Sequence, residues 1–254
     1  MACIFCGVDR KISREHLWPD WARKLLESDS QTSAPLVPHV IAGSDGHFRQ
    51  WEAPVFSATL KEVCRVCNNG WMSDVEELTK DLVVPMLRDE EVRLGKEEQL
   101  CVAIWGYMKV LTLERVRAPT WVLPVASYRG LRDHLANGVA SLPRSATVFV
   151  ATHGGKALDG GYTHHLIVDS ADLGRPFFMG TFTLRQVVVQ VFENLDGPSG
   201  IAPRRLAGLE GRDAQVWPVE KSTLDWPPGE ALGDEELALY AGLAGLAEDG
   251  DDRP

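Results

Sequence analysis

The chain has 254 residues, of which 44% are hydrophobic and 24% charged, a composition typical of a globular protein that can bury a sizeable core. Its formal net charge of −10 argues against a general nucleic-acid binder, because such proteins are usually basic. No apolar run approaches the roughly 20 residues that span a bilayer, and the first residues turn polar too early for a signal peptide. We therefore expect a cytoplasmic protein with no membrane partner.

The first part of the chain is predicted to form one small domain, residues 1–88. It begins with a metal-binding turn and continues into a helix, with Pro19 in the first helical position. Residues 28–50 are rich in Ser, Pro, Gly and His, which predicts a loop or hairpin, and residues 51–63 alternate enough to predict a strand.

The domain is predicted to close with a helix over residues 73–83. Ser73-Asp74-Val75-Glu76 matches a capping box, in which the first and fourth side chains satisfy the free N–H groups of a helix start. Pro85 and the acidic run that follows it predict a boundary between two domains.

Residues 95–230 are predicted to form a second domain of the α+β class. Residues 99–116 have the apolar periodicity of an amphipathic helix. Residues 184–194 fit a helix or a strand, although the valines at 187–189 favour a strand. Residues 231–254 are predicted to hold a short helix and an acidic tail. The predicted strands are rich in Val, Thr and Phe and cover residues 120–126, 146–152, 163–169 and 177–183.

Four of the five cysteines form two Cys-x-x-Cys pairs, Cys3 with Cys6 and Cys64 with Cys67. In a reducing compartment, paired units at this spacing are typical of metal ligands rather than disulfides. Two such turns can close a tetrahedral zinc site, and four thiolates leave no open position on the ion. The sequence therefore predicts a structural zinc bound by all four cysteines. The fifth, Cys101, is expected to be a core residue.

Two further motifs accompany the cysteines. Glu15-His16-Leu17-Trp18-Pro19 lies between the pairs, and Asn68-Asn69 follows the second pair directly. The order C-x-x-C, E-H-x-x-P, C-x-x-C-N-N resembles a subgroup of the HNH endonuclease family. The resemblance covers roughly residues 1–80 and implies a ββα-metal finger.

The resemblance also implies roles for these residues. His16 corresponds to the general base, a role that a neutral imidazole suits near pH 7. Glu15 corresponds to a ligand of a catalytic divalent ion, magnesium or manganese, and Asn68 to a second ligand through its carbonyl oxygen. Asn69 is an alternative to Asn68, because the start of the following helix is not defined by the sequence.

Two observations leave alternatives open. Neighbouring strand residues point to opposite faces, so Glu15 and His16 can share one site only where the backbone bends. The Asn68-Asn69-Gly70 run also fits a left-handed turn without any chemistry. The family's middle asparagine is missing, and the residues that could replace it are Thr59, Ser57, His39 and His47.

The sequence thus predicts a metal-dependent nuclease that hydrolyses phosphodiester bonds, with DNA as the expected substrate. The second domain would provide target recognition, a homo-oligomer contact or a surface for a protein partner. Two rivals are a non-catalytic zinc module that binds nucleic acid or protein, and a subunit active only within a larger assembly. Cations that could contact phosphates, or simply face solvent, are Arg10, Lys11, Arg14, Arg23, Lys24 and Arg65.

Overall fold

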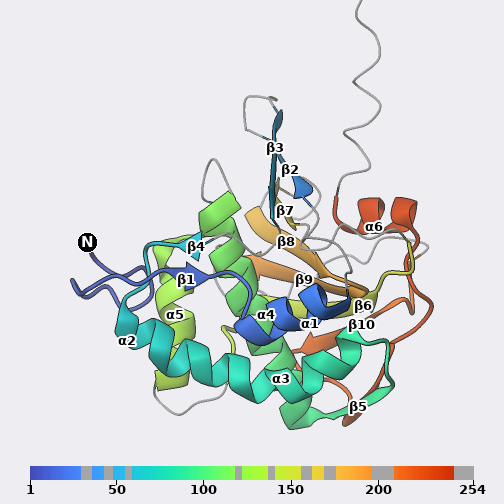
Figure 1. Ribbon diagram of the computed structural model, residues 1–254. Coiled ribbons are helices and arrows are strands. Elements are labelled where there is room, and N and C mark those ends of the chain that lie inside the picture. Colours follow the sequence, from blue (N-terminus) through green and yellow to red (C-terminus); the bar gives the residue numbers. More distant parts are fainter. Residues whose placement is uncertain are drawn as a thin grey trace, which may run out of the picture.

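A five-stranded antiparallel sheet forms one layer of the computed structural model (Figure 1). The strands follow the order β10-β6-β9-β8-β7, and every neighbouring pair is antiparallel. They comprise β6 (Ala146–Thr152), β7 (Tyr162–Val168), β8 (Pro176–Leu184), β9 (Val187–Asn194) and β10 (Asp213–Trp217). The structure describes residues 1–29, 36–42, 48–54, 59–117, 122–136, 141–155, 162–168, 176–195 and 209–242.

Three of the predicted strands are confirmed as β6, β7 and β8, and the ambiguous segment 184–194 contains a fourth, β9. β9 begins at Val187 and is almost continuously buried, which explains its run of valines. The hairpin between β8 and β9 turns at Arg185, which adopts a left-handed φ of 50°.

A long buried helix, α4 (Lys96–Arg117), packs against this sheet. The helix predicted over residues 99–116 is confirmed, but the amphipathic pattern predicted for it is wrong. It is buried on almost every side, so its sequence is apolar nearly all round. Gly106 permits the close approach, because a β-carbon there would lie 2.8 Å from Cγ1 of Val189. α4 therefore forms the centre of the core.

The N-terminal segments cover the other side of α4 (Figure 1). β1 (Glu15–His16) pairs with β4 (Thr59–Leu60), and α1 (Asp20–Asp29) follows β1 directly. Trp21 of α1 lies against Trp105 of α4, with ring centroids 6.5 Å apart. A second pair of strands, β2 (Leu36–Ala42) and β3 (Phe48–Pro54), forms the hairpin predicted in this region.

The helix that leads away from the second cysteine pair starts earlier than predicted. α2 (Arg65–Cys67), η1 (Asn68–Met72) and α3 (Ser73–Leu87) follow without a break, with a kink at Gly70. The capping box predicted at Ser73 is wrong, because the backbone N–H of Ser73 already donates to Asn68 within the helix. Its fourth residue, Glu76, makes an ion pair instead.

The two halves of the chain share one hydrophobic core. A single cluster of buried residues extends from Cys3 to Trp226. The predicted boundary lies where α3 ends and β5 (Val92–Gly95) begins, and β5 pairs with β11 (Thr223–Trp226) near the other end of the chain. Pro85 lies inside the last turn of α3 rather than beyond it. Among the described residues, buried side chains of the segment 1–88 therefore pack in the same cluster as those of the second half.

The strand predicted over residues 120–126 is wrong where the structure describes it. Residues 122–124 are not paired in a sheet, and α5 (Val125–Ala136) begins at Val125. Pro124 precedes this helix and its carbonyl accepts from the N–H of Ser127. The predicted C-terminal helix is confirmed in its first half as α6 (Asp234–Tyr240), at the opposite end of the molecule from the N-terminus (Figure 1).

Within the described residues, no helix combines the length and the apolar character that crossing a membrane requires.

Candidate metal centre and the adjoining polar cluster

The four cysteines of the two Cys-x-x-Cys pairs come together in the structure. One sulfur from each of Cys3, Cys6, Cys64 and Cys67 lies within 4.8 Å of every other. The sulfurs of Cys6 and Cys64 are 3.8 Å apart. Zinc–sulfur bonds near 2.3 Å in a tetrahedron place the sulfurs about 3.8 Å from one another. The predicted ligands are thus assembled with spacing that fits zinc, and four soft donors suit that ion.

Local backbone geometry holds the two cysteine turns in place. Gly7 has a φ of +69°, and its N–H donates to the carbonyl of Cys3, which closes the first turn. The N–H of Cys64 donates to the sulfur of Cys3 at 3.3 Å. The backbone N–H of Ile4 in the first turn also donates to the carbonyl of Glu62, two residues before Cys64. The site is therefore formed by main-chain contacts as well as by its ligands.

The thiols share their protons unequally even without an ion. The pKa of Cys3 is lowered to about 4, chiefly because the Cys67 thiol donates a hydrogen bond to it. The same contact raises the pKa of Cys67, and burial raises that of Cys6. A thiolate at Cys3 surrounded by three further sulfurs is a ready binding place for a soft cation.

Glu15 and His16 lie on opposite faces of β1. Glu15 is 5% exposed, whereas His16 is exposed to solvent. β1 pairs in ordinary register with β4, where Glu15 faces Leu60 and His16 faces Thr59. The structure therefore separates the two side chains, as strand geometry requires where there is no bulge.

Glu15 belongs to a buried cluster between β1, α3 and α4. Burial raises the pKa of its carboxyl to about 7, opposed by the ammonium of Lys109 and assisted by the carboxylate of Glu76. The side chain of Lys109 is completely buried, and its Nζ lies 2.5 Å from Oε1 of Glu76. One ammonium thus stands near two carboxyl groups, of which Glu76 is its direct partner.

Asn68 lies beside the strand segment that precedes Glu15. Its Nδ2 donates to the hydroxyl of Ser13 at 3.0 Å, and that hydroxyl donates to the carbonyl of Val63. Because the hydroxyl proton is already used, Ser13 can only accept from Asn68, which orients the amide. Oδ1 of Asn68 then points away from Ser13, where it could meet an ion.

Asn69 is exposed beside Asn68, and the alternative of a left-handed turn is wrong. Asn68 has helical angles, Gly70 has a φ of −105°, and Asn69 is not among the described residues with positive φ. The Asn-Asn pair therefore belongs to a kinked helix start.

Glu15 and Asn68 carry oxygen atoms of the kind that hard cations prefer, but the described contacts place Glu15 beside Lys109 and Asn68 beside Ser13. The ammonium of Lys109 is the positive charge that already neighbours Glu15. Within the part of the chain that the structure describes, the four cysteines are the one group of three or more Cys, His or acidic side chains assembled closely enough for an ion.

The replacements proposed for the family's middle asparagine fall in different places. Thr59 stands directly across from His16 in the strand pair. Ser57 and His47 lie outside the described residues, as does the side chain of His39.

Exposed cations gather around the cysteine turns. Residues 1–25 and 59–72 contain seven Lys and Arg against four Asp and Glu, although the whole chain has a net charge of −10. Arg14 and Lys61 are exposed close to His16 in sequence or across the strand pair. The exposed members with no ion pair to another described residue are Arg10, Lys11, Arg14, Lys24, Lys61 and Arg65.

Lys109, Glu76 and Ser13 adjoin the predicted site, although the cysteine, Glu-His and Asn-Asn motifs do not include them. Lys109 carried a usable signal, since it is a lone charge in an otherwise apolar stretch of α4. Glu76 had been assigned to a helix cap, and Ser13 has no pattern that distinguishes it.

Comparisons with protein-family models, curated proteins and solved structures find no match to this chain.

Proposed function

We propose that the protein is a metal-dependent endonuclease of the HNH type that hydrolyses phosphodiester bonds, with DNA as its substrate. One observation carries the proposal. A four-cysteine site joins a short antiparallel strand pair to a helix that starts at the second cysteine turn, and the strand pair bears Glu15 and His16. β1, β4 and this helix follow one another in the order of a ββα-metal finger, with α1, β2 and β3 inserted between the two strands.

In this proposal His16 takes a proton from the attacking water. Its exposure gives water and a phosphodiester direct access to the imidazole. Arg14 and Lys61 would attract the substrate's phosphates, since both are exposed and neither has an ion pair with another described residue. The reducing cytoplasm is the compartment that suits the cysteine site.

Glu15 and Asn68 would hold the divalent ion, with Asn69 as the alternative ligand. A magnesium or manganese ion bound there would supply the Lewis acid for the scissile phosphate. Because Glu15 and His16 lie on opposite faces of β1, joint action on one phosphate requires the backbone to bend there when ion and substrate bind.

The second candidate is a zinc module without catalytic activity. The observation that favours it is the environment of Glu15, which is buried beside the ammonium of Lys109 instead of facing the same space as His16. A related version is a subunit that becomes active only when a partner reshapes this face. Both keep the structural zinc and predict no hydrolysis by the isolated chain.

A plasmid-nicking assay separates these candidates. Zinc-loaded protein is incubated with supercoiled DNA and magnesium or manganese, beside His16→Ala and Glu15→Gln. We expect nicking by the parent and a loss of at least about 100-fold in His16→Ala, the usual contribution of a general base. Lys96→Ala, which removes an exposed cation at the start of α4 outside the cysteine turns, serves as the control.

Equal nicking by the parent and His16→Ala would show that His16 is not the base. No nicking by the folded, zinc-loaded parent would favour the non-catalytic module or the partner-dependent subunit. Activity that appears only after cell extract is added, and is lost with His16→Ala, would identify the latter.

A further inference from the structure

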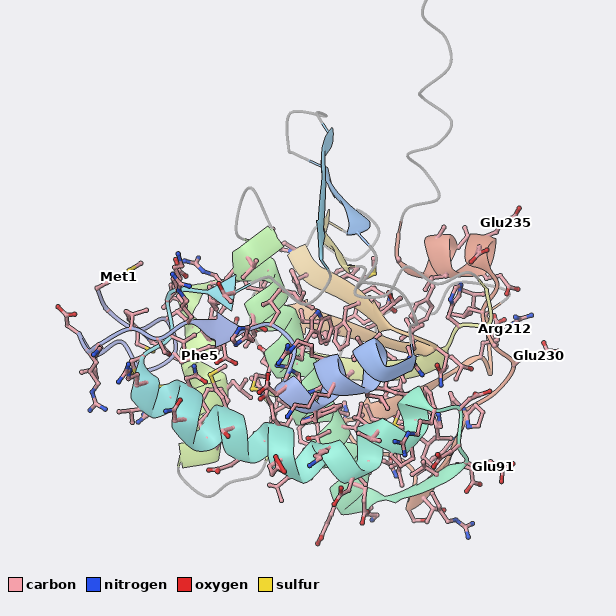
Figure 2. The ribbon with its side chains drawn as sticks, in the orientation of Figure 1. Met1, Phe5, Glu91, Arg212, Glu230 and Glu235 are labelled. Carbon is pink, nitrogen blue, oxygen red and sulfur yellow. The ribbon has the colours of Figure 1, made fainter. Side chains whose placement is uncertain are left out.

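Helix α5 lies against the cysteine turns, although the sequence separates the two widely (Figure 1). Phe5 lies between Cys3 and Cys6 and is fully buried. Its ring makes edge-on contacts with Trp71 at 5.2 Å and with Tyr128 of α5 at 5.9 Å between centroids. Figure 2 shows Phe5 at this end of the molecule, next to α5. The first cysteine turn is therefore packed directly on α5.

The guanidinium of Arg129 lies over the first cysteine turn. A β-carbon added to Gly7 would lie 3.1 Å from Nη2, 3.2 Å from Cζ and 3.4 Å from Nε of Arg129. Three atoms of one planar group at nearly equal distance place that group across the glycine rather than end-on. Gly7 directly follows the ligand Cys6, so a positive charge lies next to the cysteine cluster.

Arg132 follows Arg129 by three residues, a spacing that puts both side chains on the same side of α5. Its guanidinium pairs with Asp133 at 2.8 Å, and this contact raises its pKa most. The charges of Cys67 and Cys6 raise that pKa further. A second arginine of α5 is therefore within electrostatic reach of two of the four sulfurs.

The positions of Arg129 and Arg132 matter because of the net charge of a zinc ion bound by four thiolates. Such a centre has a surplus of negative charge, and groups outside the ligands tune how firmly the metal is held. We propose that Arg129 and Arg132 of α5 form the outer cationic layer of the zinc site, so that the second half of the chain controls zinc retention. The proposal does not depend on nuclease activity.

The rate at which full-length, zinc-loaded protein releases zinc to a chromogenic chelator tests this proposal. We compare the parent with the double variant Arg129→Gln/Arg132→Gln. The control is Arg88→Gln/Arg144→Gln, which removes two exposed arginines elsewhere. We expect release about tenfold faster in the α5 variant and unchanged in the control, since outer-layer partners commonly affect metal affinity by that factor or more.

Dependence on salt separates a charge effect from a packing effect. Salt screens exposed charges, so raising sodium chloride should speed zinc release from the parent and have little effect on the α5 variant. Arg129→Lys/Arg132→Lys keeps both charges and should release zinc nearly as slowly as the parent, which also covers the case in which the glutamine variant folds poorly.

Three results would overturn the proposal. The first is zinc release from the folded glutamine variant at the rate of the parent. The second is faster zinc release from the glutamine variant with the same salt dependence as the parent. The third is a lysine variant that releases zinc as fast as the glutamine variant. The last two would assign α5 a packing role only.

Discussion

Glu15 and His16 are neighbours in the chain, but their side chains have different surroundings. Glu15 is buried beside Lys109 and Glu76, and His16 is exposed across from Thr59. The raised pKa of Glu15 means that a substantial share of its carboxyl groups are protonated at neutral pH, and a bound divalent cation would reverse that balance. The protonation state of Glu15 therefore depends on whether a divalent cation is bound beside its carboxyl group.

The variant Glu15→Gln tests the protonation of this carboxyl through stability. The folded-state pKa of about 7 lies above the ordinary 4.5. The native state therefore holds the proton more tightly, and stability falls as pH rises from 4.5 through 7. Glutamine does not titrate. The free energy of unfolding of Glu15→Gln should therefore exceed that of the parent by an amount that grows with pH and reaches up to about 3 kcal/mol at pH 8.

Urea unfolding of zinc-loaded parent and variant between pH 5 and pH 8, without other divalent ions, measures this difference. A difference in the free energy of unfolding that does not change with pH would show that Glu15 is already ionised in the native state. If Glu15 also binds magnesium, adding that ion should narrow the gap at high pH.

At the residue scale, the zinc ligands could be predicted and the neighbours of Glu15 could not. The spacing of each Cys-x-x-Cys pair is a local property that the chain shows directly. Lys109 and Glu76 are brought to Glu15 by the packing of α3 on α4, which has no counterpart in sequence spacing.

The contact between α3 and α4 depends on one charge pair inside an otherwise apolar interface. Lys109 is completely buried, and its ammonium reaches Glu76 of α3. Removing one partner of such a pair leaves the other charge without compensation, whereas removing both is far less costly. The pair therefore specifies how the two helices meet more than it adds to stability.

A double-mutant cycle over Lys109→Met and Glu76→Gln tests this arrangement. We expect Lys109→Met alone to lower the free energy of unfolding by about 3 kcal/mol. The double variant should recover most of that loss, because methionine fills similar volume and glutamine carries no charge. Urea unfolding at pH 7 measures each corner of the cycle. Losses that add within about 0.5 kcal/mol would show that the two groups are not coupled.

At the element scale, α4 and β9 are buried on nearly every side, so their apolar runs rather than a periodic pattern indicate them. The sequence predicts α4, β6, β7 and β8 but not β5, β10 or β11. It fails at the capping box of Ser73, because the helix had already started at Arg65 and crossed the kink at Gly70. It fails again at residues 122–126, where apolar residues serve a turn and the start of α5 rather than a strand. In both cases the neighbouring element, not local preference, decides the outcome.

At the scale of the whole molecule, the charge is divided between two ends. Cations surround the cysteine turns, while Glu230, Glu235 and other acidic residues lie at the opposite end, near Arg212 (Figure 2). The net charge of −10 is therefore an average over unlike surfaces, and it does not exclude an anionic partner at the cysteine end.

The larger of the two clusters of buried side chains contains residues from both predicted domains. Trp18, which follows the Glu-His motif, is buried against Phe182 of β8, with ring centroids 5.6 Å apart. Phe5 depends in the same way on Tyr128 of α5. The change of composition near residue 88 lies between α3 and β5. Composition alone does not show which side chains pack together across that point.

The segment of residues 1–88, expressed alone with zinc, should consequently fail to form a fixed tertiary structure. Without the second half, side chains such as Phe5 and Trp18 lose their cover, at about 2 kcal/mol for each large apolar group. A few such losses approach the entire stability of a small domain. Dispersion of amide signals in a proton–nitrogen spectrum measures the outcome, with the full zinc-loaded chain as control. A well-dispersed spectrum and a cooperative unfolding transition for the fragment would show instead that the zinc centre stabilises it without α4 and α5.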